Sequence, residues 1–190
     1  MQIRLSNGLS NVTLASLRAK GLSLEGAVAG ERTVGGGLRS VKADVSEITE
    51  TDGLKLAVEI KPVHLAVGRA VWNRFGDIRT FAVNVHLKFP FAVVGGILTL
   101  PTTERVQSGR DDGWKPTTRL IERAIGRFKR AGGRQTEGDA SHLLEAIAVV
   151  VFDRESGEVD PRLPAVGSGL RWQDFIDQMA ETYEARFGGY

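Results

Sequence analysis

Two neighbouring stretches in the first third of the chain alternate between apolar and polar residues. Val41 to Ile48 and Leu54 to Lys61 both show the two-residue period of a β-strand that is covered on one face. Between them lies Thr49-Glu-Thr-Asp-Gly53, and its Asp-Gly pair is a strong signal for a tight turn between antiparallel strands. The pattern therefore predicts a β-hairpin over residues 41–61.

The apolar period then changes to three or four residues, which is typical of a helix. It holds from Leu65 to about Phe89, and Pro90 ends it. The next segment, Phe91 to Leu100, is almost wholly apolar, as in a strand that is covered on both faces. A strand, a helix and a second strand in this order predict a parallel pair joined by a right-handed crossover.

Further helices and one further strand are predicted outside this unit. Capping residues and stop signals mark the helices, an apolar run marks the strand, and polar segments with glycine or proline mark two long loops. The expected helices cover residues 10–20, 24–32, 116–131 and 170–187, the strand covers 142–152, and the loops cover 101–115 and 153–169. This order predicts one domain over residues 1–190, of the α/β class, with a mixed central β-sheet flanked by helices.

The composition is that of a folded globular protein. Among 190 residues, 42% are hydrophobic and 25% are charged, which excludes a mainly disordered chain. No apolar run is long enough to span a membrane, and the first residues lack the apolar segment of a secretory signal, so a cytoplasmic protein is expected. The absence of cysteine excludes disulfides, cysteine-ligated zinc and thiol nucleophiles.

Carboxylates are expected on one face of the hairpin. If its turn consists of Asp52 and Gly53, Asp44 lies opposite Lys61, and Ser46 lies opposite Glu59. Side chains alternate across a strand, so these four residues share a face. Two carboxylates at short range repel each other, and Mg²⁺ relieves the repulsion by binding them together with water and phosphate. A neighbouring lysine can orient or deprotonate an attacking water.

Asp44, a gap of fourteen residues, and then Glu59-Ile60-Lys61 in an apolar strand form a pattern that resembles the PD-(D/E)XK nuclease superfamily, which includes many type II restriction endonucleases. The resemblance covers residues 24–152 and implies a restriction-endonuclease-like core. It implies that Asp44, Glu59 and Ile60 bind Mg²⁺, for which Mn²⁺ can substitute, and that Lys61 assists the water. The sequence departs from the motif because Ala43 stands where proline is usual, and because no separate strand is predicted before residue 41.

An acidic residue on the preceding helix often joins such sites in this superfamily. Glu25, in the predicted helix 24–32, is the matching catalytic candidate, and Glu31 is the second. The alternative to a nuclease site is a solvated hairpin face, on which Asp44 and Lys61 form a cross-strand ion pair that contributes at most about 1 kcal/mol.

A row of arginines recurs every three or four residues along the predicted helix 116–131, and few acids balance it. Such a row can follow the phosphates of a nucleic acid, or it can be an ordinary solvated face. Helix 65–89 starts directly after the candidate catalytic strand and brings further polar residues near it. The candidate nucleic-acid contacts are Arg119, Arg123, Arg127, Arg130 and Arg134 in the row, and Arg69 and Asn73 on helix 65–89.

These features together predict a Mg²⁺-dependent endonuclease that hydrolyses double-stranded DNA, most similar to a type II restriction enzyme or another phage-defence enzyme. A chain with one active site cuts one strand, so a homodimer is expected on a duplex. The alternative is a catalytically inert nuclease-fold module that binds nucleic acid or a partner protein.

Overall fold

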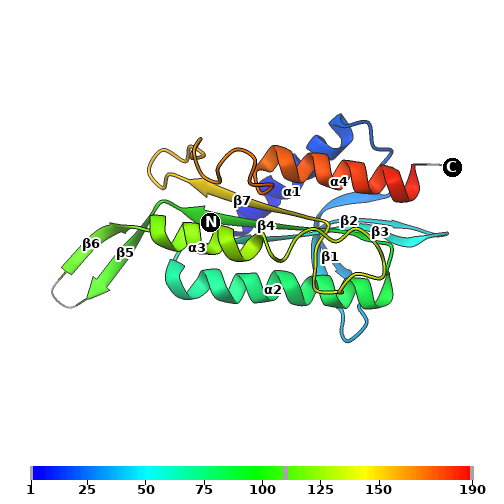
Figure 1. Ribbon diagram of the computed structural model, residues 1–190, viewed down its shortest axis with the longest axis horizontal. Helices are drawn as coiled ribbons and strands as arrows, with labels where there is room; N and C mark the ends of the chain where they lie inside the picture. Colours follow the sequence, from blue (N-terminus) through cyan, green and yellow to red (C-terminus); the bar gives the residue numbers. More distant parts are fainter. Residues whose placement is uncertain (1, 109–110, 189–190) are drawn as a thin grey trace.

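A mixed β-sheet forms the centre of the molecule (Figure 1). The computed structural model describes residues 2–108 and 111–188. The strand order is β1-β2-β3-β4-β7. The pairs β1–β2 and β2–β3 are antiparallel, and the pairs β3–β4 and β4–β7 are parallel. The predicted mixed α/β class is thereby confirmed. The bounds of these strands are Ala27–Val34 for β1, Val41–Thr49 for β2, Gly53–Pro62 for β3, Val93–Pro101 for β4 and Ala146–Phe152 for β7.

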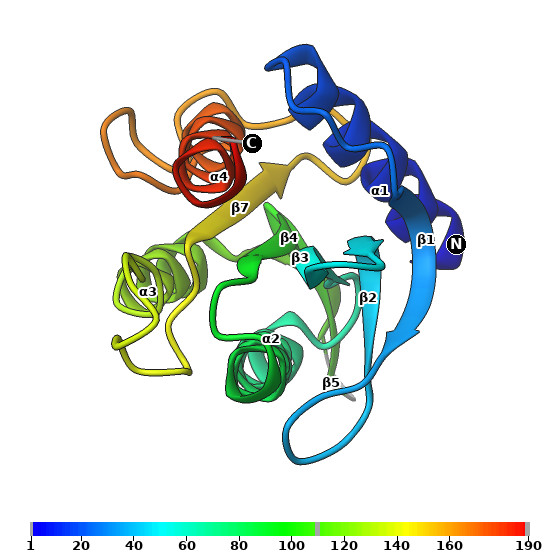
Figure 2. The same ribbon diagram turned by 90° about the vertical axis from the view of Figure 1, so that its right-hand side faces the viewer.

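Helices cover both faces of this sheet. Figure 2 shows α1 (Gln2–Ala19) and α4 (Trp172–Phe187) on one face, and α2 (Val67–Lys88) and α3 (Thr118–Phe128) on the other. Each face has its own apolar core, which agrees with the near-continuous apolar sequence of the central strands. No helix in the described ranges is long and apolar enough to cross a membrane.

Two adjacent glycines in β4 allow the helices on both faces to approach the sheet closely. A Cβ atom on Gly95 would lie 2.8 Å from the ring of Phe175 in α4, and one on Gly96 would lie 2.7 Å from the side chain of Ile78 in α2. Gly96 pairs with Glu59 of β3. The close packing at Gly96 therefore brings the middle of α2 over the strand that carries the candidate catalytic residues.

The predicted helix 24–32 is wrong, because residues 27–34 form the edge strand β1. Its pairing with β2 shifts between Ala29 and Arg32, where Gly30 has a φ of 124°. Such a bulge adds a residue to one strand and interrupts the alternation of apolar and polar positions. The two-residue period that would have marked a strand is therefore broken in the sequence.

The first helix is longer than predicted, since α1 begins at Gln2 and not at residue 10. Ser10 is buried inside the helix, where its hydroxyl donates to the carbonyl oxygen of Ser6 at 2.9 Å, so it is not an N-cap. The predicted loop 101–115 instead contains a two-stranded hairpin of β5 (Thr103–Ser108) and β6 (Asp111–Pro116), which projects from one end of the molecule (Figure 1). Its sequence is polar on most positions, so it carries no apolar alternation.

Candidate active site

The hairpin β2–β3 carries the candidate catalytic residues in a register that differs from the prediction. Ser46 pairs with Ala57 and Val45 with Val58, and continuing this register by one position aligns Asp44 with Glu59. The predicted partners, Lys61 for Asp44 and Glu59 for Ser46, are wrong by two residues. A shift of two residues keeps Glu59 and Lys61 on their predicted face, because the side-chain period of a strand is two. Asp44 departs from the prediction, because Ala43 packs in the core under α2 whereas Val45 packs in the core under α1 and α4, so the alternation of β2 breaks at Asp44.

The turn of the hairpin accounts for the shifted register. Thr49 pairs with Gly53, so three residues lie between the strands instead of two, and Gly53 has the positive φ of 70° that such a loop requires. The hydroxyl of Thr49 accepts a hydrogen bond from the backbone N–H of Asp52 at 3.1 Å. A second irregularity, between Glu47 and Ile48, completes the shift.

The carboxylate of Asp44 lies at the point where β2 and β3 separate. The registered pairs of the two strands end at Val45 and Val58, and beyond them the backbone N–H of Ile60 donates to Asp44 Oδ2 at 2.7 Å. The hydroxyl of Ser6 in α1 donates to the other oxygen, Oδ1, at 3.1 Å. Asp44 is thus fixed beside Glu59 by one contact from the strand and one from a helix.

Glu59 is a buried carboxylate in direct contact with Lys61. The Glu59 side chain is 9% exposed and the Lys61 side chain is 24% exposed, and Lys61 Nζ forms an ion pair with Glu59 Oε1. Burial raises the pKa of Glu59 to about 7; the negative charges of Asp44 and Asp77 raise it further, whereas Lys61 lowers it. An acid with these neighbours favours either a proton or a bound cation at neutral pH.

The alternative of a solvated hairpin face is wrong. Glu59 is buried, and the ion pair of Lys61 is with Glu59 on the same strand instead of with Asp44 across the hairpin. The opposite face of the hairpin is core, as predicted, since Val45, Val58 and Ile60 are all buried in the apolar cluster under α1 and α4.

Polar residues of α2 adjoin this site. Asp77 contributes to the raised pKa of Glu59, and Arg74 Nη1 donates to Asp77 Oδ2 at 2.9 Å. Asn73 lies one helical turn before Asp77 on the same side of α2, and both Asn73 and Arg69 are exposed. Sequence reasoning missed Asp77, although its spacing of three residues from Arg74 is typical of an ion pair on a helix.

The two further acidic candidates do not occupy the predicted position. Glu25 lies exposed in a turn before β1, next to the start of a strand whose Ala27 pairs with Glu47, and it is not on a helix. Glu31 lies in the bulge of β1 and forms an ion pair with Lys42 at 2.5 Å. The helix that precedes the strands is α1, and residues 2–19 contain no acidic side chain.

The donor set at this site fits Mg²⁺ chemistry. Two carboxylates are sufficient, because Mg²⁺ usually takes its other ligands from water and from substrate phosphates. The side chain of Ile60 is buried in the apolar core, so only its backbone carbonyl oxygen is available as a ligand. Within residues 2–108 and 111–188, no group of three or more acidic, cysteine or histidine side chains could hold a metal ion. A metal here would therefore depend on Asp44 and Glu59.

The arginines predicted to contact phosphates divide into two groups. Arg119, Arg123 and Arg127 are exposed on α3, and the guanidinium carbons of Arg123 and Arg127 lie 5.7 and 4.3 Å from the ring centroid of Trp72 in α2. Arg134 does not belong to this row, because it lies beyond the end of α3 and is only 1% exposed.

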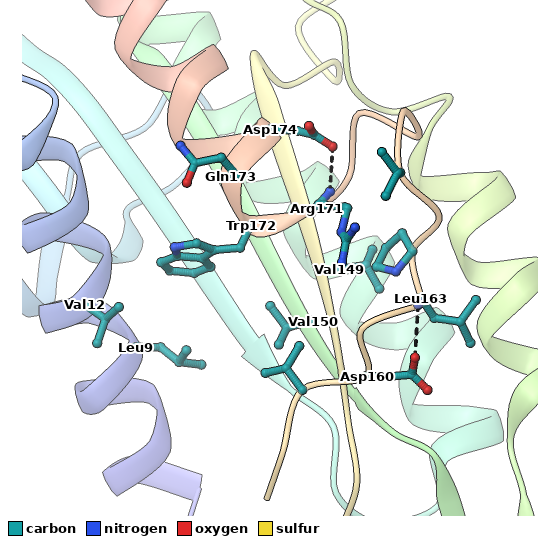
Figure 3. A pocket seen from close by; sticks show the side chains of 13 residues that line it. Leu9, Val12, Val149, Val150, Asp160, Leu163, Arg171, Trp172, Gln173 and Asp174 are labelled. Carbon is teal, nitrogen blue, oxygen red and sulfur yellow. Dashed lines mark hydrogen bonds between the residues drawn. The ribbon is translucent and has the colours of Figure 1, made fainter.

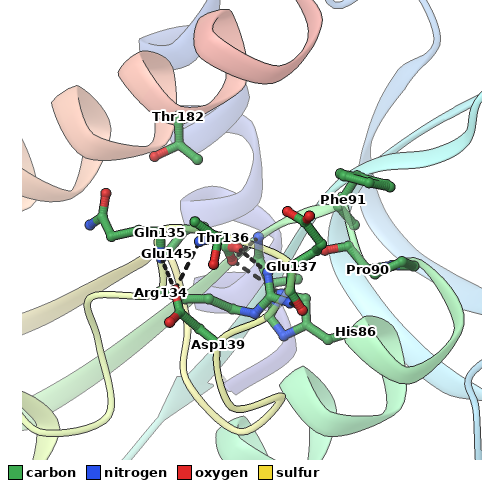
Figure 4. Close-up of polar contacts among 12 residues, drawn as sticks. His86, Pro90, Phe91, Arg134, Gln135, Thr136, Glu137, Asp139, Glu145 and Thr182 are labelled. Carbon is green, nitrogen blue, oxygen red and sulfur yellow. Dashed lines mark hydrogen bonds and ion pairs between the residues drawn. The ribbon is translucent and has the colours of Figure 1, made fainter.

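Arg134 instead belongs to a buried ion cluster centred on Glu145 (Figure 4). Arg134 Nη1 and Arg186 Nη1 donate to Glu145 Oε1 at 3.1 and 2.8 Å. His86 Nε2 lies 3.1 Å from Oε2, which also accepts the backbone N–H of Val94 at 2.9 Å. The cluster joins α2, β4, α4 and the start of β7 at the end of β4 away from the projecting hairpin, so its role is structural.

An apolar cavity of about 610 Å³ lies elsewhere, between α1, β7 and the start of α4. Figure 3 shows Leu9 and Val12 of α1 lining it together with Val150 and Trp172. None of the three candidate catalytic residues of β2 and β3 lines this cavity.

No protein-family model matches the chain, and comparisons with curated proteins and with solved structures give no significant match. The resemblance to PD-(D/E)XK nucleases therefore rests on the residues of β2 and β3 and on their geometry.

The raised pKa of Glu59 predicts a stability that falls as pH increases. The native state holds its proton up to about pH 7, whereas the unfolded chain releases it near the ordinary value of 4.5, so the native state is favoured less and less between these values. Without divalent metal, we expect the free energy of unfolding of wild type to fall by roughly 1–3 kcal/mol relative to that of Glu59→Gln between pH 5 and pH 8. Urea unfolding in EDTA at both pH values measures this difference, and parallel pH profiles for the two proteins would contradict it.

Proposed function

We propose that this chain is a Mg²⁺-dependent endonuclease of the PD-(D/E)XK type that hydrolyses phosphodiester bonds of double-stranded DNA. The observation that carries the proposal is the neighbourhood of Asp44, Glu59 and Lys61: the Asp44 carboxylate is bound by the backbone N–H next to Glu59, its charge acts on Glu59, and Lys61 contacts Glu59. The order of β1, β2, β3, α2 and β4 supports it, because the strand missing from the sequence prediction is present as β1.

Asp44, Glu59 and the backbone carbonyl of Ile60 are the proposed ligands of the Mg²⁺. When bound, Mg²⁺ neutralises charge on a scissile phosphate and lowers the pKa of a nearby water. The hydrogen bonds from Ile60 and Ser6 hold the Asp44 carboxylate in position before the substrate arrives. Lys61 orients the attacking water with its ammonium group, and the contact with Glu59 holds that ammonium at the site.

Arginine side chains supply the proposed contacts to the DNA backbone. Arg69 and Asn73 are exposed on α2, the helix that carries Asp77 beside Glu59, and the exposed arginines of α3 extend the positive surface. One such site per chain cuts one strand, so cleavage of a duplex by a homodimer is part of the proposal. A type II restriction enzyme or another phage-defence enzyme is the biological role that this chemistry fits.

A second candidate function is a nuclease-fold module that binds nucleic acid without cutting it. The ion pair between Lys61 and Glu59 favours this alternative, because the lysine already neutralises the buried carboxylate without a metal. Incubation of supercoiled plasmid with the protein in Mg²⁺, and in EDTA as the control, separates the two functions. Strand cleavage that depends on Mg²⁺ supports the enzyme, and binding without cleavage supports the inert module.

Lys61→Ala is expected to lower Mg²⁺-dependent cleavage by roughly 10²- to 10⁴-fold while duplex binding stays within about threefold of wild type. The lysine acts on the water, whereas the arginines provide most of the attraction to the duplex. The matched control is Lys42→Ala, because Lys42 lies on the neighbouring strand β2 and is 65% exposed in its surface pair with Glu31. Wild-type turnover by Lys61→Ala, measured by plasmid nicking, would remove the lysine from the mechanism.

A further inference from the structure

A small pocket lined by arginines lies between α2 and α3. Its lining consists of Phe75, Arg79, Arg127, Arg130 and Ala131, and its volume is about 290 Å³. This volume has room for a phosphate group and several waters, since each water occupies roughly 30 Å³ in the liquid.

Within the described residues, the three arginines of this pocket form no ion pair with an acidic side chain. Other arginines of the chain form ion pairs, as Arg74 does with Asp77 and Arg162 does with Asp160. In the part of the chain that the structure describes, no carboxylate is paired with Arg79, Arg127 or Arg130. Three positive charges thus converge on one pocket without compensation, and such a site attracts an anion.

Arg79 also carries a buried donor that is not satisfied within the described residues. Its Nε atom is buried and has no hydrogen-bond partner there. Buried donors are nearly always paired, and leaving one unpaired is costly, so this atom points to a missing acceptor.

Aromatic side chains hold two of the guanidinium groups in place. Arg127 lies with its guanidinium carbon 4.3 Å from the ring centroid of Trp72, and that of Arg79 lies 5.7 Å from the ring centroid of Phe75. Phe75 in turn packs on Phe128 of α3, with 4.7 Å between ring centroids. Stacking restricts the side chains before a ligand binds, which reduces the entropy lost on binding.

The pocket is separate from the carboxylate site. Residues 77 and 79 are two positions apart on α2, which is about 200° around a helix, so Arg79 lies on the side of α2 away from Asp77. Asp77 is the α2 residue whose charge acts on Glu59, whereas Arg79 contributes to the pocket shared with α3.

We propose that Arg79, Arg127 and Arg130 form a second site that binds a phosphate group. Guanidinium groups bind phosphate through paired, charge-assisted hydrogen bonds, and three of them around one pocket match the oxygens of a single phosphate. The phosphate belongs either to the backbone of a nucleic-acid duplex or to a free nucleotide. Arg127 is also one of the arginines of α3 proposed above to contact the DNA backbone, so the duplex case rests on that proposed function. The phosphate site itself does not depend on cleavage, because its residues lie outside the carboxylate site.

The test measures binding in EDTA, where no cleavage occurs. One arm follows a fluorescent 20-base-pair duplex by anisotropy over a range of salt concentrations, and the other follows ATP by calorimetry. The variants are Arg79→Gln and the more exposed Arg130→Gln. The control is Lys129→Gln, which removes the same charge from a residue on the neighbouring pocket that includes Gly132 and Asp174. Melting curves check that all variants are folded.

We expect each arginine variant to lower the affinity for one of the two ligands by about tenfold, while Lys129→Gln changes both affinities by less than twofold. If the duplex is the ligand, the slope of log K against log salt also falls by about one for each arginine removed. Weaker binding of ATP alone identifies a free nucleotide as the source of the phosphate. Unchanged binding of both ligands, or an equal loss in Lys129→Gln, would overturn the proposal.

Discussion

Asp44→Asn is expected to lower Mg²⁺-dependent DNA cleavage by roughly 10²- to 10⁴-fold without unfolding the protein. The substitution removes one of two carboxylates proposed to hold the metal. A bound metal ion contributes several kcal/mol to transition-state stabilisation. An asparagine side-chain oxygen can still accept the hydrogen bond that Ile60 donates to Asp44, so the separation of β2 from β3 is preserved. Loss of the repulsion between Asp44 and Glu59 is expected to raise the stability of the metal-free protein slightly.

Thermal melts with and without Mn²⁺, run beside the cleavage assay, measure this effect. Mn²⁺ should raise the melting temperature of wild type and leave that of Asp44→Asn nearly unchanged, because a ligand that binds only the native state stabilises it. Ca²⁺ should occupy the wild-type site and support DNA binding without cleavage, since its coordination is looser than that of Mg²⁺. The control is Asp177→Asn, which removes a surface acid of α4 paired with Lys20 at 2.5 Å. Cleavage by Asp44→Asn at the wild-type rate would exclude Asp44 as a metal ligand.

The hairpin of β2 and β3 shows what the sequence could predict about the site. Alternation of apolar and polar residues identified both strands and the shared face of Glu59 and Lys61, because a two-residue period depends only on local sequence. It also predicted Asp44 on that face, but the Asp44 carboxylate accepts hydrogen bonds from Ile60 of β3 and from Ser6 of α1, the helix on the other face. The register could not be predicted from the Asp-Gly pair. It depends on a three-residue loop closed by Thr49 and Gly53 and on an irregularity next to Glu47.

Features that depend on contacts between residues far apart in the sequence were not predicted. The bulge in β1 broke the period of the strand, and the missing strand led to the choice of Glu25 as an acid on a preceding helix. Arg134 fitted the spacing of an exposed arginine row, but its position is set by Glu145 and Pro90, which no local pattern connects with it. The burial of Glu59 likewise arises from the packing of α2 over the sheet, which the sequence around Glu59 does not reveal.

The buried cluster around Glu145 leads to the largest expected effect on stability. Glu145→Gln should lower the free energy of unfolding by roughly 3–5 kcal/mol, because it leaves the guanidinium groups of Arg134 and Arg186 facing a neutral amide in a buried position. Both ring nitrogens of His86 face oxygen acceptors, Glu145 and the carbonyl of Ser141, so the histidine cannot turn away without losing a second contact. Urea unfolding followed by tryptophan fluorescence at pH 7 gives the difference.

The pH dependence of the difference in unfolding free energy between wild type and Glu145→Gln tests whether the charge of Glu145 causes it. Burial alone would raise the pKa of Glu145, but the hydrogen bond and charge of His86, the N–H of Val94 and the charge of Arg186 hold it below the ordinary value. A depressed native pKa stabilises the folded state above the unfolded pKa of about 4.5, and this stabilisation is lost as the pH falls through the native value. The difference in the free energy of unfolding between wild type and Glu145→Gln should therefore become smaller as the pH is lowered. Glu181→Gln, which changes an exposed acid of α4, serves as the control. A Glu145→Gln protein within about 1 kcal/mol of wild type at pH 7 would show that packing, and not the ion cluster, holds these elements together.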